Sequence, residues 1–141
     1  GLMQISPSTG VWASKELQIL DFSLEYLYKP EVNIRIGCWY LDKLNVEFNS
    51  NLRTVLAAYN GGSGNVNKWL NDNRYSQDGE SLSNIPFKET DEYVEKVLKN
   101  YKIYKKVYKN TFKAGQSIFD KVFGKSLLMF KKIIKGFMSN V

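Results

Sequence analysis

Apolar residues recur at steps of three and four along most of this chain, and this spacing limits its fold more than any other feature. The first regular set is Val32, Ile36, Trp39, Tyr40 and Leu44. Similar patterns begin at Leu52 and Val66, and a longer one begins at Thr90. Such spacing places apolar side chains on one face of a helix, and no strand-like alternation competes with it. The sequence therefore predicts an all-α fold.

Prolines, glycines and polar clusters separate the predicted helices. Polar residues around Pro7 mark a helix start, so a mostly helical stretch is expected from there to about Leu27. The sequence KPE at 29–31 interrupts that stretch. Three glycines in the segment 60–65 predict a tight loop with unusual backbone angles, and the polar segment 71–84 predicts a second loop.

The charge of the chain is distributed unevenly, and its basic character belongs to the C-terminal third. Residues 1–95 contain 8 Lys and Arg against 13 Asp and Glu, whereas residues 96–141 contain 12 Lys and one acidic residue. Within 111–141, lysines fall between apolar residues at helical spacing, which predicts a basic amphipathic helix. We therefore divide the chain into a domain of residues 1–110 and a C-terminal extension of residues 111–141.

The extension is consistent with three roles. Its helix packs on the domain, or residues 112–141 contact a membrane or polymer surface, or they bind a partner protein. Deleting residues 113–141 and measuring binding to lipid vesicles separates the membrane role from the others. Nucleic-acid binding is disfavoured, because the N-terminal part is acidic and contains no known reader motif.

The absence of histidine and the single cysteine exclude several classes of chemistry. No internal disulfide can form, and Ser-His-Asp catalysis, Cys-His catalysis and the common histidine metal sites are excluded. Cys38 lies in an apolar helical pattern and is interpreted as a small buried residue. The glycine-rich segment lacks the Lys-Ser/Thr of a phosphate-binding loop, so no nucleotide, metal or other cofactor is expected.

Three segments carry residues suited to chemistry: GLMQISPST at 1–9, AAYNGGSGNVNKWL at 57–70 and IPFKETDEYVEKVLKNYKIY at 85–104. Tyr59 and Asn60 end a predicted helix just before the glycines, a junction that can present a ring and an amide to a sugar. The alternative is that Tyr59 is a core aromatic and the glycines form only a turn.

Glu89 lies at a predicted helix start, and Tyr93 follows four residues later on the same face. A carboxylate and a phenol that point the same way form a plausible polar cluster. The alternative is that Glu89 only caps the helix, since a carboxylate is favoured at a helix N-terminus.

Together with PEVNIRIGCWYL at 30–41, the three segments closely resemble the soluble lytic transglycosylase domain, a lysozyme-like family, over about residues 1–104. The resemblance implies an α-rich domain with a groove for a peptidoglycan glycan strand. It also implies cleavage of the β-1,4 bond between N-acetylmuramic acid and N-acetylglucosamine without water, which leaves 1,6-anhydromuramoyl ends. The location expected from that substrate is the cell envelope or the extracellular space.

The resemblance also implies roles for individual residues. The substrate-binding residues it implies are Gln4, Tyr59, Asn60, Glu89 and Tyr93. Of these, Gln4 faces the groove, Tyr59 lies beside the catalytic carboxylate, and Glu89 lines the groove without being the acid. Ser6 departs from the family pattern, which commonly has a methionine there, and so puts the packing of one sugar subsite in doubt.

The catalytic glutamate of the family belongs to a Glu-Ser motif on a helix that precedes GLMQ. We therefore expect a lysozyme-like domain that lacks its first helix, with the acid upstream of Gly1, and assign no catalytic residue in this chain. Two alternatives remain open: a catalytically inactive module that binds peptidoglycan, and a lysozyme-type hydrolase, which would use water as the acceptor.

Overall fold

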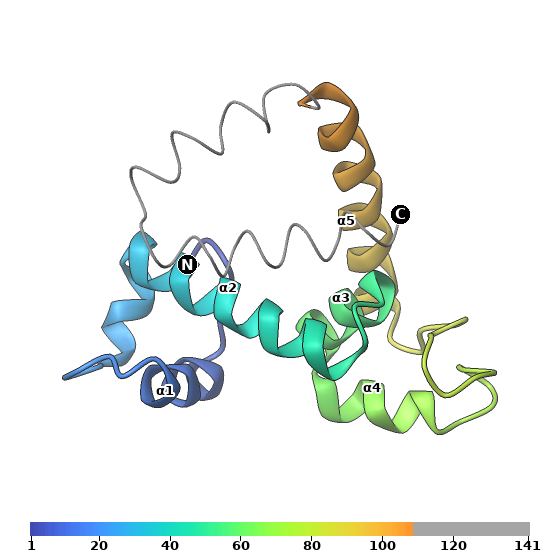
Figure 1. The fold of residues 1–141 in the computed structure, drawn as a ribbon, viewed down its shortest axis with the longest axis horizontal. Helices are drawn as coiled ribbons and strands as arrows, with labels where there is room; N and C mark the ends of the chain where they lie inside the picture. The colour runs from blue at the N-terminus through green and yellow to red at the C-terminus, as the bar shows by residue number, and fades with distance from the viewer. Residues whose placement is uncertain (109–141) are drawn as a thin grey trace.

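The computed structural model describes residues 1–108, and this part of the chain contains helices and connecting segments without strands. The elements are α1 (Pro7–Glu16), the 3-10 helix η1 (Leu24–Tyr28), α2 (Pro30–Glu47), α3 (Leu52–Gly61), α4 (Ser63–Leu70) and α5 (Lys88–Val107). Figure 1 shows α2 crossing the middle of the molecule, with α1 near one end and α3 and α4 near the other. The prediction of an all-α fold is confirmed for these residues.

Side-chain caps explain where two of the helices begin. Ser6 Oγ accepts a hydrogen bond from the Thr9 N–H, and Pro7 occupies the first helical position of α1. Asn51 Oδ1 accepts from the Thr54 N–H at the start of α3. Such caps satisfy N–H groups that have no partner inside the helix. Ser6, which departs from the family pattern, thus has a structural role as the cap of α1.

The stretch from Pro7 to Leu27 is less helical than predicted. The α-helix ends at Glu16, a turn follows, and η1 begins at Leu24. Gln18 and Asp21 adopt left-handed backbone conformations with φ of 51° and 52°. An α-helix cannot continue through such residues, so the predicted helical stretch is divided into α1 and η1.

The glycine-rich segment forms a much shorter break than the predicted loop. Helix α3 continues through Gly61 and α4 begins at Ser63, so Gly62 alone separates them with φ of 87°. Gly64 lies inside α4. One residue suffices because glycine adopts a left-handed conformation without steric cost. Gly61 serves close packing instead, since a Cβ there would lie 3.1 Å from Thr90 Oγ1.

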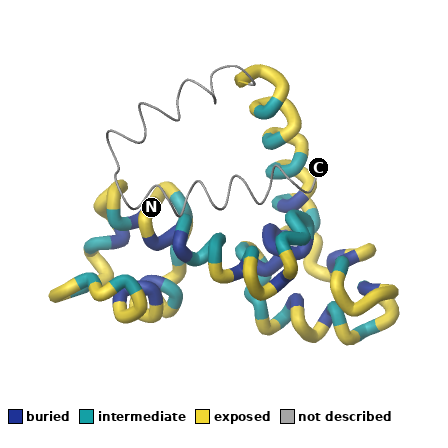
Figure 2. The backbone as a smooth tube through the Cα atoms, in the orientation of Figure 1, coloured by how far each residue is buried: buried dark blue, intermediate teal, exposed yellow. Residues whose placement is uncertain are grey.

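Two groups of buried residues form the core. The larger group contains Leu44, Phe48, Val55, Leu56, Ala57, Ala58, Val66, Trp69, Leu82, Ile85 and Val94. The smaller group contains Ala13, Leu27, Ile36 and Trp39. Figure 2 shows the buried positions of α1 and of the first part of α2 on one side, and those around α3 on the other. Tyr40 packs against both groups, so α2 connects them.

The segment between α4 and α5 is non-helical, as predicted, and a carboxylate organises part of it. Asp78 Oδ1 accepts hydrogen bonds from the N–H groups of Ser81 (2.8 Å) and Glu80 (2.9 Å). The hydrogen bond from the Ser81 hydroxyl, with these two backbone bonds and a bond from the Ser76 hydroxyl, holds the pKa of the Asp78 carboxyl well below its usual range. The segment is therefore an ordered connection to α5.

Helix α5 is buried near its start and becomes exposed toward its end. Val94 is fully buried, whereas Tyr104 and Val107 near the other end are more than half exposed. Arg53 of α3 forms ion pairs with Asp91 (3.0 Å) and with Glu95. None of the helices within residues 1–108 combines the length and apolarity that crossing a bilayer requires. The extension predicted at 111–141 lies outside the described residues, and the boundary at 110 stays a prediction.

Candidate functional site

The N-terminal segment is fixed to α2 by a buried asparagine. The Met3 N–H donates to Asn33 Oδ1 (2.7 Å), and Asn33 Nδ2 donates to the Leu27 carbonyl (2.9 Å). Asn33 is only 1% exposed. Gly37, one turn further along α2, lets the Met3 side chain approach, since a Cβ there would lie 2.7 Å from Met3 Cγ. The GLMQ sequence therefore has a defined position on the helical body.

Gln4 lies in a tight turn of this segment. It has a left-handed φ of 50°, and its backbone N–H donates to the Gly1 carbonyl at 3.2 Å. Its side-chain Nε2 donates to the same carbonyl at 2.6 Å. Gln4 is exposed to solvent, so its side chain is held at the surface of the molecule.

Tyr59 connects α3 to the same segment. Its hydroxyl donates to the Met3 carbonyl at 2.8 Å, and its ring lies 5.5 Å from that of Tyr40. Burial raises the pKa of the Tyr59 phenol above its usual range, and neighbouring Tyr93 and Cys38 raise it further. Tyr59 is half-buried and packs against the larger core group, and its predicted role in binding a sugar stays a prediction.

The remaining candidate residues gather where α3 meets α5. Asn60 is exposed at the end of α3, and Glu89 is exposed in the first turn of α5. The close approach of Gly61 to Thr90 brings these two helix ends together. Tyr93 lies one turn further along α5 and is half-buried. The structure thus assembles the three chemistry-bearing segments in one region, with Tyr59 in contact with the first.

The phenols and the thiol around Tyr59 keep their protons to a higher pH than the free groups would. Burial raises the pKa of Tyr93, of Tyr40 and of the Cys38 thiol. Cys38 is half-buried rather than fully buried as the sequence suggested. Phenols that keep their protons remain hydrogen-bond donors, as the contact between Tyr59 and Met3 requires.

The folded protein should lose stability as the pH rises above about 9 to 10. Unfolded thiols and phenols release protons at their usual pKa values of 9.0 and 10.0, whereas the folded state holds them to higher pH. The folded state then binds more protons, so the free energy of unfolding falls with rising pH. Urea denaturation at about pH 8 and about pH 10.5 measures this. Tyr59→Phe should show a smaller loss, and equal stability at both pH values would contradict the prediction.

The described side chains of this region do not form a recognisable metal-binding group. Among residues 1–108, no three or more His, Cys, Asp or Glu side chains are grouped so that they could hold a metal ion. The polar groups assembled here are phenols, amides and one carboxylate, which suit hydrogen bonding to a polar ligand.

The Transglycosylase SLT domain family matches residues 1–82, more than half of the chain. The chain belongs to this family. The matched region contains Gln4, Tyr59 and Asn60, whereas Glu89 and Tyr93 lie beyond it. The resemblance inferred from the sequence is therefore confirmed at the level of the family.

Curated relatives with known names support the same assignment. The chain is 36% identical over 112 residues to the putative soluble lytic murein transglycosylase of Haemophilus influenzae, covering 78% of the chain and 18% of that protein. It is 40% identical over 100 residues to the soluble lytic murein transglycosylases of Salmonella typhimurium and Escherichia coli K12, covering 70% of the chain and 16% of each. The chain therefore spans less than a fifth of these relatives. No solved structure matches it.

Within this SLT domain, sequence reasoning missed the residue that holds the candidate site together. Asn33 belongs to the segment PEVNIRIGCWYL, and the resemblance assigns no role to it. A polar residue between Val32 and Ile34 at the start of an apolar helix was the available signal. The role of Asn33 depends on its hydrogen bond with Met3, which is 30 residues away in the sequence.

Proposed function

We propose that this chain forms the glycan-binding framework of a peptidoglycan lytic transglycosylase domain. Gln4, Tyr59, Asn60, Glu89 and Tyr93 are the proposed substrate-binding residues. The observation that carries the proposal is the pair of bonds made by Met3, whose N–H and carbonyl bind Asn33 and Tyr59. These bonds hold the GLMQ turn against the end of α3, where Asn60 is exposed.

The proposed reaction cleaves the β-1,4 bond between N-acetylmuramic acid and N-acetylglucosamine. A carboxylic acid protonates the leaving oxygen, and the same group, now a carboxylate, accepts the proton of the muramoyl 6-hydroxyl. That hydroxyl closes the 1,6-anhydro ring. One carboxyl group can serve both steps because the nucleophile belongs to the substrate and is already positioned. Most glycosidases need two carboxylates for the corresponding steps.

Such an acid must stay protonated, which requires an apolar environment with little water. No Asp or Glu among residues 1–108 is buried. Glu89 is exposed in the first turn of α5, so it does not lie in such an environment. We therefore propose, as the family resemblance implies, that the acid lies in a segment of the parent protein that precedes Gly1. The proposed location of that protein is the cell envelope or the extracellular space.

Mass spectrometry of purified peptidoglycan after incubation with the protein tests this function. A chain joined to the preceding segment of its parent protein should release 1,6-anhydromuramoyl products, and residues 1–141 alone should release none. Products that contain one more water molecule would instead identify a lysozyme-type hydrolase. Anhydro products from residues 1–141 alone would contradict the proposed location of the acid, and Glu89→Gln would then show whether Glu89 supplies it.

Binding without cleavage needs its own measurement. The chain of residues 1–141 should sediment with peptidoglycan, and Asn60→Ala combined with Glu89→Gln should reduce the bound fraction. Both side chains are exposed, so this double variant should keep the helical circular dichroism of the parent. Binding with no anhydro products from any longer form would favour the alternative of an inactive peptidoglycan-binding module.

A further inference from the structure

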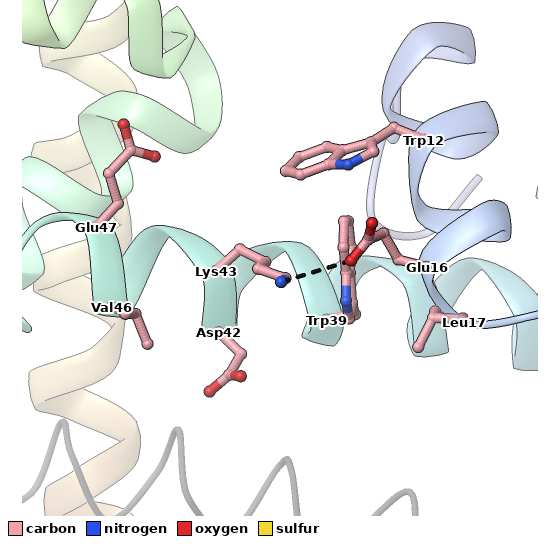
Figure 3. A pocket seen from close by; sticks show the side chains of 8 residues that line it. All are labelled: Trp12, Glu16, Leu17, Trp39, Asp42, Lys43, Val46 and Glu47. Carbon is pink, nitrogen blue, oxygen red and sulfur yellow. Dashed lines mark ion pairs between the residues drawn. The ribbon is translucent and has the colours of Figure 1, made fainter.

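A concave surface lies between α1 and α2, apart from the substrate-binding residues proposed above. It is a cavity of about 610 Å³ lined by Trp12, Glu16, Leu17, Trp39, Asp42, Lys43, Val46 and Glu47. Figure 3 shows side chains from both helices facing this space, with the two tryptophans and the Glu16–Lys43 pair close together. None of the five proposed substrate-binding residues lines it.

Trp12 forms an exposed aromatic surface that its neighbours hold in place. Its ring meets the Trp39 ring edge to face, with centroids 4.7 Å apart and planes at 74°. The Tyr40 ring also meets the Trp12 ring edge to face, with centroids 6.2 Å apart. Trp12 nevertheless remains 45% exposed, while Trp39 is buried at 3%. A large aromatic side chain fixed in one orientation and open to water is a suitable platform for the apolar face of a ligand.

Polar groups surround this platform. Lys43 Nζ lies 3.7 Å from Glu16 Oε2 and 5.6 Å from the centre of the Trp39 ring. Asp42 and Glu47 of α2 also line the pocket, so its lining contains three carboxylates and one ammonium group. The carboxylates accept hydrogen bonds from hydroxyl groups, and their excess of negative charge disfavours anionic ligands. A neutral ligand with one apolar face and several hydroxyl or amide groups fits this chemistry.

Aromatic contacts connect the pocket to the proposed site. Tyr40 touches Trp12 on one side, and on the other its ring lies 5.5 Å from that of Tyr59. Tyr59 in turn donates to the Met3 carbonyl. The Tyr40 ring therefore lies between Trp12 and Tyr59, so two ring contacts separate the pocket from the proposed site.

From this arrangement we infer that the pocket between α1 and α2 binds a neutral N-acetylated sugar of the glycan strand, stacked on Trp12. Glu16 and Lys43 hydrogen-bond its hydroxyl and acetamido groups. The inference deepens the proposed function and depends on it, because it adds a second sugar position to the same strand. Longer oligosaccharides should then gain affinity from a surface that short ones do not reach.

Calorimetric titration of the full chain with oligomers of N-acetylglucosamine tests the inference. Trp12→Ala should weaken binding of the hexasaccharide about fivefold to tenfold, since the stacking surface is lost, and binding of the disaccharide less than about twofold. Tyr28→Ala is the matched control, because Tyr28 is 81% exposed and does not line the pocket. It should leave both affinities unchanged.

A second variant separates loss of the pocket from loss of the fold. Glu16→Gln with Lys43→Gln keeps both tryptophans and removes only exposed charges, so it should stay folded and bind the hexasaccharide about threefold more weakly. Unchanged hexasaccharide affinity in both pocket variants would overturn the inference. If Asn60→Ala with Glu89→Gln abolished binding in that case, the proposed function would stand without the second position. A parent chain that binds neither oligomer would refute both.

Discussion

Replacing Asn33 by leucine is expected to lower the free energy of unfolding by about 2–4 kcal/mol. Asn33 is 1% exposed and bonds both the Met3 N–H and the Leu27 carbonyl. Leucine has a similar volume but leaves these two backbone groups without a partner, one of them part-buried and the other buried. The loss arises because each group gives up its bonds to water on folding and receives no bond in exchange.

Urea denaturation followed by circular dichroism measures this loss, and α2 itself supplies the control. The Asn45 side-chain oxygen is buried and has no hydrogen-bond partner among the described residues. Asn45→Leu should therefore leave stability unchanged or increase it, since no bond is broken. If Asn33→Leu and Asn45→Leu behaved alike, Asn33 would not have the anchoring role described above. Faster amide exchange in residues 1–5 of Asn33→Leu should accompany the loss.

Replacing Trp69 by alanine should cost about 3–5 kcal/mol, the range for removing a large aromatic side chain from a core. Trp69 is 7% exposed and meets the Phe87 ring edge to face at 4.9 Å. Its ring also lies against Gly61, where a Cβ would come within 3.3 Å of the indole. The substitution therefore opens a cavity where α3, α4 and the start of α5 meet.

Thermal and urea denaturation of Trp69→Ala measure the size of this effect. Leu20→Ala is a suitable control, because Leu20 is 83% exposed and its loss should change stability by less than about 0.5 kcal/mol. A cost for Trp69→Ala as small as that of the control would mean that the indole does not support this corner. Because Asn60 and Glu89 lie at the same corner, peptidoglycan sedimentation should weaken even under conditions where the variant stays folded.

The two substitutions test different supports of one proposed site. Asn33 holds the GLMQ turn against α2, and Trp69 holds the end of α3 near the start of α5. A variant that weakens peptidoglycan binding through either support, with helical content preserved, would indicate that the relative placement of these segments matters for binding.

Local sequence determined the helices and their buried faces. The apolar positions predicted for α2 include Ile36, Trp39 and Leu44, and all three are buried. The N-terminal half of α5 likewise buries Val94, as its spacing predicted. Helical periodicity concerns residues three and four apart, so it can be read from the sequence without the fold. The four motif segments likewise indicated the family, because their order and spacing are properties of the sequence alone.

Only the tertiary structure decided how these segments meet. Met3 and Tyr59 are 56 residues apart, and nothing in either sequence segment specifies that a hydroxyl of one donates to a carbonyl of the other. The contact between the Trp12 and Trp39 rings, which joins α1 to α2, could not be predicted from the sequence either. Contacts between distant segments depend on the packing of whole helices, which local propensities do not encode. The sequence therefore determined the elements and the family, whereas packing decided which side chains share a site.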